Sequence, residues 1–403
     1  MNILFICDEY PPGKTGGIGT SVQLLARELV NQGHKVIVAG LYSYSFGGDP
    51  HFYDQGVEVW RLRYGPDLGL HDNIGYKLYR KLPAPIKAAL NGKKAFDRFV
   101  VFIKKVIIEK AIDIIEIADW NTFSVEIGFP VRWPNFSVPL VLKSHGSYTK
   151  IYTELGLKMS DNHRATDHAL FNRADAHAAV SVNTAEINRK LFAIKQDVKV
   201  LYNGILIPSP AEQPREQHLV VYSGALTASK GVHKLIRAWE TVARSMPDAR
   251  LLLYGKGNIA SFASRLGPSS SRSVMFMGHV SREALFESLK KASVAVYPSF
   301  SETFGLAVLE AMANGCAVIF TKYGSGPEIV SHKIDGMLVD PSQEAEIAAA
   351  IEFLFNNPEL AEQMGERARK KVSEKFNITT VVHDHLHFYR EVVSRFKAER
   401  AVV

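Results

Sequence analysis

Short hydrophobic runs alternate with amphipathic stretches along most of the chain. Residues 2–7 form an apolar run, a loop rich in Pro and Gly follows, residues 20–31 have helical spacing, and residues 35–39 are apolar again. Apolar runs of strand length predict buried strands, and apolar residues three or four positions apart predict helices. The opening of the chain therefore predicts a strand, a helix and a second strand parallel to the first.

The same alternation predicts one α/β domain in the first half of the chain. Further strand-like runs cover residues 57–62, 112–117, 140–144, 176–181 and 198–202, with helical patterns between most of them. Between residues 205 and 217, prolines stand among Ser, Glu and Gln, a composition typical of a linker. We therefore place a domain boundary in this segment.

A second α/β domain is predicted after the linker. Its strand-like runs cover residues 219–223, 250–254, 274–277, 294–297, 317–320 and 336–339, and its helical patterns cover residues 231–244, 259–266 and 282–291. From residue 342 onward only helical patterns occur, interrupted at Asn357-Pro358 and Phe376-Asn377. Strands that alternate with helices are typical of doubly wound parallel sheets.

One stretch of the second half, Tyr297-Pro-Ser-Phe-Ser-Glu-Thr-Phe-Gly-Leu-Ala-Val-Leu-Glu310, holds two carboxylates around a predicted helix start. The apolar run before it ends in a turn, and helical spacing then runs from Phe304 to Gly315. Glu302 is thus predicted in the loop at the carboxyl end of a strand, and Glu310 on the helix that follows. Doubly wound sheets bind their ligands at this edge.

The glycine-rich loop at residues 11–20 fits neither of the two common phosphate-binding motifs. A P-loop would need Gly at Asp8, and the dinucleotide fingerprint would need Gly at Val22. What remains is a strand-to-helix turn whose backbone N–H groups, around Gly16 and Gly17, can receive an anion or a sugar hydroxyl. The alternative is a flexible turn without a ligand.

Two similar turns stand in the second half. The first runs from Ser223 through Gly224 to Gly231, with Lys230 at the mouth of the next predicted helix. A lysine there can neutralise phosphate charge together with the backbone amides. Gly255-Lys-Gly257 is a third such turn and is less specific.

Histidines suggest two further sites. His145 lies at the end of one predicted strand and Asp119 at the end of the strand before it. A histidine in this position is more often a structural hydrogen-bond partner, but facing a cleft between two domains it can bind a ligand. His383, His385 and His387 could form a metal cluster, although a solvated helix is the favoured interpretation. The sequence has no Asp-x-Asp pair, a common means of holding a divalent ion on a sugar diphosphate.

The net charge of +7 is concentrated in one segment. Residues 76–110 hold ten basic side chains and two acidic ones, with apolar residues between them. This pattern suits a helical surface that meets anionic lipid or an anionic acceptor, and also a pair of ordinary amphipathic helices with solvated lysines.

Composition bears on localisation. No apolar run approaches the roughly 20 residues that span a bilayer. Two cysteines, Cys7 and Cys316, fall in or beside predicted buried strands, which suits a reducing compartment. We therefore expect a cytoplasmic protein. The basic segment suggests in addition a peripheral contact with the inner face of the membrane.

These residues together resemble the retaining nucleotide-sugar glycosyltransferases of family 4. The most specific likeness is the Glu-x7-Glu motif, met by Glu302 and Glu310 with Phe304-Gly305 inside it. Other positions that match the family are Gly16-Gly17, Gly33-His34, Ser181, Asn203-Gly204, Lys230-Gly231, residues 327–330 and Asp335-Gly336.

The resemblance implies an α/β protein of the GT-B fold, with two Rossmann-like doubly wound domains facing across a cleft. Residues 1–205 would form the acceptor domain, with a C-terminal helix at about 379–403 packed back on it. Residues 206–378 would form the donor domain.

The same resemblance implies roles for single residues. Glu310 would hold the ribose hydroxyls, Lys230 the donor diphosphate, and His145 would lie by the reacting sugar. The expected catalytic residues are His145, Lys230 and Glu302; the expected donor-binding residues are Gly16, Gly17, Gly224, Lys230, Gly255, Phe304, Gly305, Leu306 and Glu310; the expected acceptor-binding residues are Asp119 and His145. No metal site is expected.

The expected activity is transfer of a hexose-type sugar from a nucleotide diphosphate sugar, with UDP as the guessed nucleotide, to a cell-surface polysaccharide or a lipid-linked acceptor. The nucleotide sugar is a co-substrate, and neither a cofactor nor a nucleic-acid partner is expected. Ala225 stands where the family usually has an arginine beside the donor phosphate. Alternatives are therefore a nucleotide-sugar epimerase or hydrolase, or a non-catalytic binder of nucleotide sugars or glycans.

Overall fold

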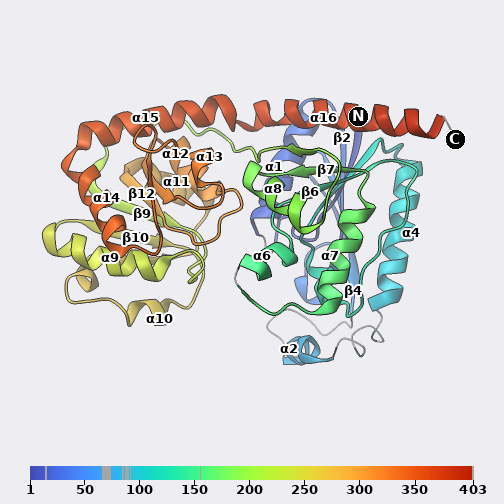
Figure 1. The fold of residues 1–403 in the computed structure, drawn as a ribbon, viewed down its shortest axis with the longest axis horizontal. Helices are drawn as coiled ribbons and strands as arrows, with labels where there is room; N and C mark the ends of the chain where they lie inside the picture. Colours follow the sequence, from blue (N-terminus) through green and yellow to red (C-terminus); the bar gives the residue numbers. More distant parts are fainter. Residues whose placement is uncertain are drawn as a thin grey trace. The chain divides into compact units, whose positions relative to one another are not determined.

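A computed structural model describes residues 1–13, 16–65, 74–83, 86, 90, 92–154 and 156–401. The chain divides into two compact units (Figure 1). Unit 1 comprises Met1–Gly204 with Ile378–Val403, and unit 2 comprises Ile205–Asn377.

Unit 1 is built on one sheet with strand order β3-β4-β2-β1-β5-β6-β7-β8. The strands are β1 Asn2–Ile6, β2 Lys35–Ser43, β3 His51–Asp54, β4 Val57–Tyr64, β5 Ile114–Ala118, β6 Leu140–Ser144, β7 Ala176–Ala179 and β8 Val198–Val200. All neighbours are parallel except β3, an antiparallel edge strand that the hydrophobic pattern did not predict. The order reverses between β1 and β5, where ligands bind in doubly wound sheets.

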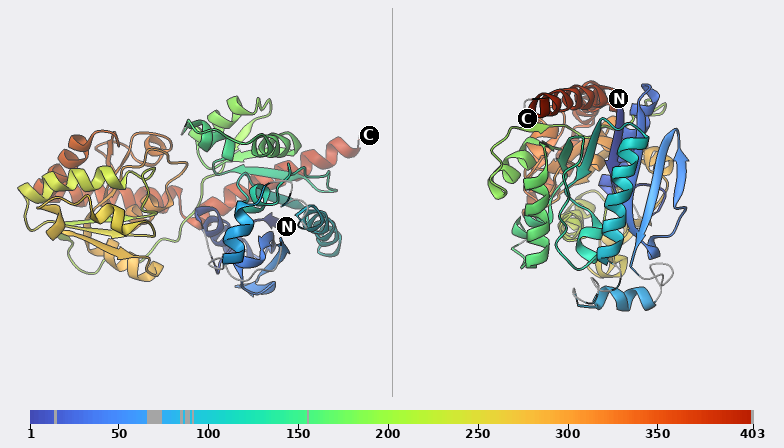
Figure 2. Two further views of the ribbon diagram at one scale, coloured as in Figure 1. Left: turned by 90° about the horizontal axis from the view of Figure 1, so that it is seen from below. Right: turned by 90° about the vertical axis from the view of Figure 1, so that its right-hand side faces the viewer.

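Helices cover both faces of this sheet (Figure 2). The described helices of unit 1 are α1 Gly17–Asn31, the short 3-10 helix η1 Tyr44–Phe46, α2 Ile74–Lys81, α4 Lys93–Glu109, α5 Thr122–Glu126, α6 Tyr148–Glu154, α7 Asp161–Arg173, α8 Val182–Leu191 and α16 Ile378–Ala401. Apolar residues of α4, α5 and α7 pack on one face, and those of α1 and α16 pack on the other. The two large clusters of buried apolar side chains therefore lie one on each face.

Helix α16 joins unit 1 through a stripe at helical spacing. Val382, Leu386 and Tyr389 are buried in the core that α1 also lines. Gly204 permits the close approach of the helix start, because a Cβ there would lie 2.7 Å from the Cα of Ile378. The C-terminal segment therefore completes the core of unit 1.

Unit 2 contains a second parallel sheet with strand order β11-β10-β9-β12-β13-β14. The strands are β9 Glu216–Ser223, β10 Arg250–Tyr254, β11 Val274–Gly278, β12 Ala292–Tyr297, β13 Ala317–Thr321 and β14 Met337–Val339. Its helices are α9 Val232–Ser245, α10 Ile259–Ala263, the 3-10 helix η3 Ser270–Arg272, α11 Arg282–Lys291, α12 Leu306–Ala313, α13 Gly326–Ile329, α14 Glu344–Asn356 and α15 Pro358–Lys375. The order reverses between β9 and β12.

The predicted α/β class with two doubly wound sheets is confirmed, and most element bounds lie within a few residues of the prediction. Helix α1 starts at Gly17 instead of Thr20, so that Gly16 and Gly17 lie at a helix N-terminus. Phe304 precedes α12, whose N-cap is Gly305, and its ring lies 6.0 Å from that of Phe376.

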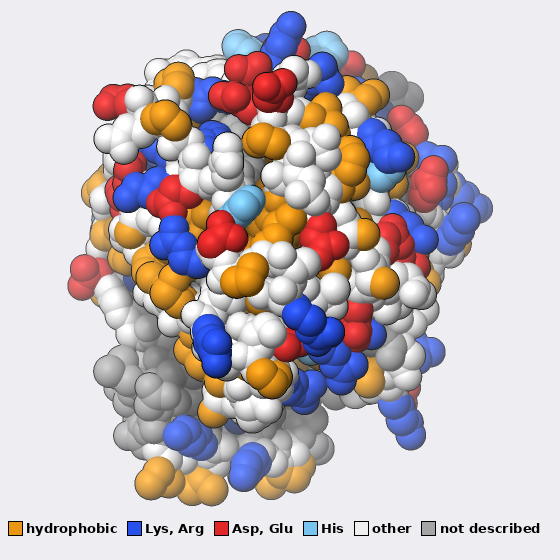
Figure 3. Space-filling model, turned by 90° about the vertical axis from the view of Figure 1, so that its left-hand side faces the viewer, with side chains coloured by type: hydrophobic (Ala, Val, Ile, Leu, Met, Phe, Trp, Pro, Cys, Tyr) orange, Lys and Arg blue, Asp and Glu red, His pale blue; other side chains and the backbone are white. Residues whose placement is uncertain are grey.

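None of the helices in the described part of the chain has both the length and the apolar composition to cross a membrane. On the face of unit 2 seen in Figure 3, basic side chains are interspersed with acidic and hydrophobic ones. Much of the basic segment 76–110 belongs to α2 and α4, and residues 84, 85, 87–89 and 91 of that segment lie outside the described residues.

Candidate functional site

In unit 2, the loops that follow β9 and β12 are joined into one structure at the reversal point of the sheet. The N–H of Phe300 donates to the carbonyl of Ser229 at 2.8 Å. Gly231 has φ +71°, and a side chain there would collide with the carbonyl oxygen of Pro298. The backbone geometry thus requires glycine at the start of α9 and fixes Lys230 beside the second loop.

Lys230 and Glu302 form an ion pair across these two loops. The distance between Lys230 Nζ and Glu302 Oε2 is 2.7 Å, and the side chains are 32% and 13% exposed. The ammonium group is therefore accessible to a ligand while its position is held by the carboxylate. This pair brings together two of the residues that the sequence singled out.

The N-terminus of α12 is the third part of this edge. Gly305, with φ +100°, precedes the first helical residue, Leu306. The hydroxyl of Ser325 donates to the carbonyl of Phe304 at 2.8 Å, and the N–H of Ser325 donates to the carbonyl of Glu302. The loop is thereby held so that the first amides of α12 start beside Glu302, where a helix N-terminus favours negative charge.

Glu310 has a partner that the sequence analysis did not identify. Arg282 Nη2 lies 2.5 Å from Glu310 Oε1, and the two side chains are 30% and 16% exposed. Arg282 begins α11, and its guanidinium lies over the ring of Phe286 at 5.4 Å. The pairing depends on the packing of α11 beside α12, for which no spacing in the sequence gives a signal.

The remaining glycine turns of unit 2 pack backbone against backbone. The N–H of Gly224 donates to the carbonyl of Tyr254 at 2.9 Å, and a side chain at Gly255 would collide with the carbonyl of Gly224. The hydroxyl of Tyr222 donates to the carbonyl of Ala225 at 2.8 Å. Close packing therefore accounts for Gly255, and a φ of +152° accounts for Gly224, without reference to a ligand.

In unit 1, Asp119 holds the loop that carries His145. The carboxylate accepts hydrogen bonds from the backbone N–H groups of His145 at 2.8 Å and Gly146 at 3.1 Å. Burial raises the pKa of Asp119 to about 7, against the opposing effect of these two bonds. Both oxygens of Asp119 are therefore engaged in shaping the loop.

His145 is neutral near pH 7. Burial, and next the ammonium group of Lys143, lower its pKa well below the usual value. Its imidazole can therefore donate or accept a hydrogen bond there without carrying a charge.

The first glycine-rich loop packs against the residues that follow β1. A Cβ at Gly16 would lie 2.6 Å from Glu9 Oε2, and one at Gly19 would collide with the carbonyl of Glu9. Asp8 accepts a hydrogen bond from the N–H of Phe123 at 3.1 Å, and burial raises its pKa to about 8. Lys14 and Thr15 lie outside the described residues.

The solvated-helix interpretation is wrong for His385. Its side chain is buried, Nε2 lies 2.9 Å from Lys143 Nζ, and Nδ1 lies 2.8 Å from the carbonyl of Val381. Its neighbours His383 and His387 are exposed. Because α16 has 3.6 residues per turn, the middle histidine of the three faces the opposite side. Among the described residues, no group of three or more His, Cys, Asp or Glu is placed to hold a metal ion.

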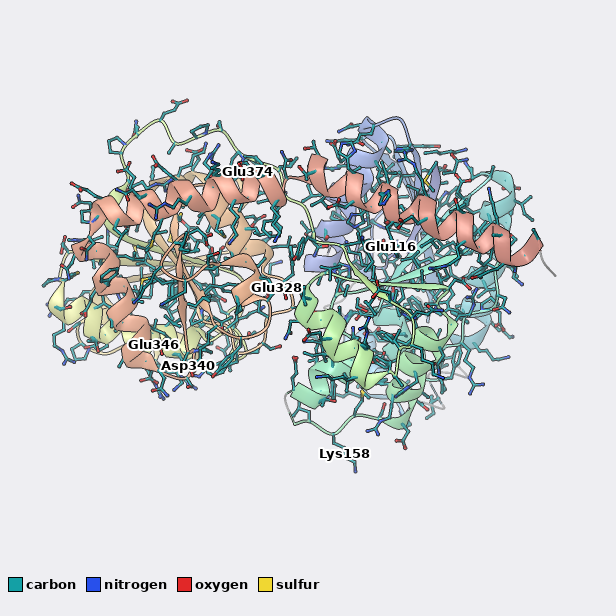
Figure 4. The ribbon with its side chains drawn as sticks, turned by 45° about the horizontal axis from the view of Figure 1, so that its top comes forward. Glu116, Lys158, Glu328, Asp340, Glu346 and Glu374 are labelled. Atoms are coloured by element: carbon teal, nitrogen blue, oxygen red, sulfur yellow. The ribbon has the colours of Figure 1, made fainter. Side chains whose placement is uncertain are left out.

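Lys143 is at the centre of a buried polar network that the sequence analysis missed. Its Nζ donates to Asn203 Oδ1 at 3.1 Å. Tyr389 donates to Glu116, which lies on β5 under α16, at 2.6 Å (Figure 4). Burial lowers the pKa of Lys143 to about 8, and the charge of Glu116 opposes this effect.

Comparison with known proteins identifies the class of this fold. Residues 15–206 match the family model described as glycosyltransferase family 4, and residues 207–371 match the one described as glycosyl transferases group 1. Glycogen synthase of Mycobacterium tuberculosis is 27% identical over 399 residues, which cover 94% of this chain and 92% of that protein.

Solved structures share the fold over nearly the whole chain. Sucrose-phosphate synthase from Thermosynechococcus elongatus has a TM-score of 0.73 at 21% identity, covering 98% of this chain and 99% of that one. Anabaena HepE in complex with UDP has a TM-score of 0.67 at 19% identity, covering 97% and 100%. The architecture is that of the GT-B proteins.

Proposed function

Because the chain belongs to the glycosyltransferases, we propose that it transfers a hexose-type sugar from a nucleotide diphosphate donor to a cell-surface polysaccharide or lipid-linked acceptor. The observation that carries the donor half of this proposal is the edge of unit 2 where Lys230, the N-terminus of α12 and Glu310 lie at the reversal point of one sheet. Doubly wound sheets bind nucleotides at such a point.

The reaction that we propose breaks the bond between the sugar and the diphosphate, which leaves negative charge on the departing phosphate. Lys230 supplies positive charge to this group, and the free amides of α12 add hydrogen-bond donors. Without a donor, Lys230 is paired with Glu302. When the donor binds, the ammonium group of Lys230 would be shared between this carboxylate and the donor phosphate. We expect this chemistry to need no divalent cation, and transfer should persist in EDTA.

We propose that the acceptor hydroxyl attacks from the face that the diphosphate leaves, so that the anomeric configuration is retained. A bond forms between the acceptor oxygen and the anomeric carbon while the bond from that carbon to the diphosphate breaks. The departing diphosphate oxygen takes the acceptor's proton, and no other reactant is consumed. His145, being neutral, would contribute a hydrogen bond to the sugar rather than a charge. The Gly16-Gly17 turn would contact phosphate or acceptor through its backbone.

On this proposal, Glu310 accepts hydrogen bonds from the donor ribose while Arg282 fixes its carboxylate. A relative of the same fold is known in complex with UDP, which supports a uridine nucleotide as the first donor to test. Thermal stabilisation by a panel of nucleotide sugars would identify the donor, since ligand binding to the folded state raises the melting temperature.

The decisive test replaces the acidic Glu310 and the basic Lys230 by alanine, one at a time. Glu310→Ala and Lys230→Ala should each lower kcat/KM by about 10- to 150-fold, because each removes a charge-assisted contact worth roughly 1.5–3 kcal/mol. Arg282→Ala should raise the donor KM with a smaller effect on kcat. Glu287→Ala, an exposed glutamate of α11, is the matched control. A Glu310→Ala protein with the wild-type rate and donor KM would refute the assignment.

Two alternatives make different predictions. A hydrolase or epimerase of the same fold would turn over the donor without any acceptor. A non-catalytic binder would bind UDP-sugars in calorimetry and form no product. This alternative is tested because Ala225 stands where the family usually has an arginine beside the donor phosphate. Ala225→Arg should then create activity if a missing phosphate contact is the cause.

A further inference from the structure

Trp120 forms an aromatic platform at the carboxyl edge of the sheet in unit 1. It follows β5 directly, beyond Asp119, and its indole stacks on the ring of Tyr148 with centroids 3.6 Å apart and planes 19° apart. Tyr148 is buried, with 7% of its surface exposed, whereas Trp120 remains partly exposed. Since Tyr148 covers one face of the indole, a ligand can stack only on the opposite face.

The platform is held rigidly. Asp119, the residue before Trp120, binds the backbone N–H groups of His145 and Gly146, so the loops after β5 and β6 are tied together. Tyr148 begins α6 only two residues after Gly146, and its other neighbours include the ring of His163 at 5.5 Å. A rigid aromatic ring binds a flat ligand surface with little loss of conformational entropy.

The surroundings of the platform are acidic. Asp167 accepts hydrogen bonds from the N–H and the hydroxyl of Thr149, both at 2.8 Å. Thr149 directly follows Tyr148 in the chain, so the carboxyl group of Asp167 lies near this ring. Asp8 follows β1, the neighbour of β5 in the sheet. Burial raises the pKa of Asp167 to about 6 and that of Asp8 to about 8, so at pH 7 the first carboxyl group is mostly charged and the second mostly protonated.

An indole face surrounded by carboxyl groups suits a sugar ring. The C–H groups of a pyranose carry partial positive charge and lie well on the negative face of an aromatic ring, and its hydroxyls can donate to carboxylates. An acyclic polyol offers no flat face, and an acyl chain gains nothing from the carboxyl groups. A nucleotide could stack its base on the indole, and the calorimetric affinity for UDP distinguishes this case from a pyranose.

We propose that Trp120 is the platform on which an uncharged pyranose ring of the acceptor stacks, with Asp119 acting as a positioning residue for both the platform and the His145 loop. This assignment rests on the proposed transferase function and narrows it, because it makes the acceptor a glycan or glycoside rather than a simple alcohol.

Acceptor kinetics test the proposal. With UDP-glucose as donor and methyl α- and β-pyranosides, maltose and cellobiose as acceptor probes, Trp120→Ala should raise the acceptor KM about tenfold or more. The donor KM and the calorimetric affinity for UDP should stay within about twofold, and Trp120→Phe should recover most of the loss. Trp60→Phe, at the other partly exposed tryptophan for which a stacked ring is described, is the matched control.

Binding can be followed without turnover. The chain has four tryptophans, of which Trp133 and Trp239 are buried. Pyranosides should change the fluorescence of the wild type and of Trp60→Phe, and should leave that of Trp120→Phe unchanged. The proposal fails if Trp120→Ala keeps the wild-type acceptor KM. It also fails if no pyranoside changes the fluorescence of the wild type, whether or not glycerol is glycosylated. Failure of the proposed function differs, since the wild type would then bind no UDP-sugar.

Discussion

At the scale of single residues, buried carboxyl groups dominate the edge of the sheet in unit 1. Asp8 and Asp119 are both buried beside loops that the sequence marked for ligand binding, and burial raises the pKa of each. Such groups bind a proton in the folded protein at pH values where the unfolded chain has lost it. They therefore link the stability of unit 1 to pH.

Asp8 provides a direct test of this linkage. Burial, and next the charge of Glu9, raise its pKa from 3.8 to about 8. Between these values the folded state binds the extra proton, so the contribution of Asp8 to the free energy of unfolding is present at low pH and is lost as the pH rises from about 4 to about 8. Asp8→Asn imitates the protonated group and should flatten this fall in urea unfolding measured between pH 5 and 8.

The matched control is Asp384→Asn, which makes the same change at an exposed position of α16. It should leave the pH dependence of the wild type intact. If Asp8→Asn and Asp384→Asn gave the same slope of unfolding free energy against pH, the buried proton would not belong to Asp8.

At the scale of elements, α16 is tied to the sheet by polar bonds as well as by its apolar stripe. His385 contacts Lys143 on β6, and Tyr389 donates to Glu116 on β5. Because all four side chains are buried, each would be costly to leave unpaired. The network fixes the rotation of α16 about its axis, which apolar packing alone specifies less sharply.

Lys143→Met should therefore destabilise unit 1. The substitution keeps the length of the side chain, removes its charge, and leaves Glu116, Asn203 and His385 without their buried donor or counter-charge. We expect a loss of about 2–4 kcal/mol in the free energy of unfolding, measured with urea. Lys199→Met, at an exposed position of β8, should change stability by less than about 0.5 kcal/mol. Equal stability of the two variants would show that the network contributes nothing.

At the scale of the whole molecule, part of the excess positive charge lies on the exposed face of α4. One face of this helix buries Phe96, Phe99 and Ile103 in the core, and the other exposes basic residues together with Val101 and Ile108, which are 66% and 78% exposed. Basic and apolar groups on one exposed helix face are typical of surfaces that contact anionic lipid. The alternative, a solvated surface, predicts no such contact.

Vesicle binding distinguishes the two. The wild type should bind phosphatidylglycerol vesicles at low salt and dissociate as ionic strength rises, because salt screens charges farther apart than the Debye length. Replacing Lys104 and Lys105 by Glu should weaken binding by about tenfold or more. Reversing two charges on α15, at Arg367 and Lys370, changes the net charge equally and should have a smaller effect. Binding that is absent, or independent of salt, would leave α4 as a solvated surface.

The sequence by itself determined most strands, most helices and the sheet edge at which Lys230 and Glu302 lie. Hydrophobic periodicity is a local property, and a parallel sheet with a reversal in strand order brings the ends of particular strands together. Lys230 and Glu302 could be assigned to one edge for this reason, and the structure pairs them. The short edge strand β3 escaped detection because its four residues alternate in burial over too few positions to give a pattern.

Tertiary structure alone decided the partners of the buried and half-buried side chains. Arg282 meets Glu310 across 28 positions, and Lys143 meets His385 across 242. Trp120 stacks on Tyr148 because two loops are tied by one carboxylate. Such contacts depend on how helices and loops pack in three dimensions, and a periodicity of two or 3.6 residues carries no record of them.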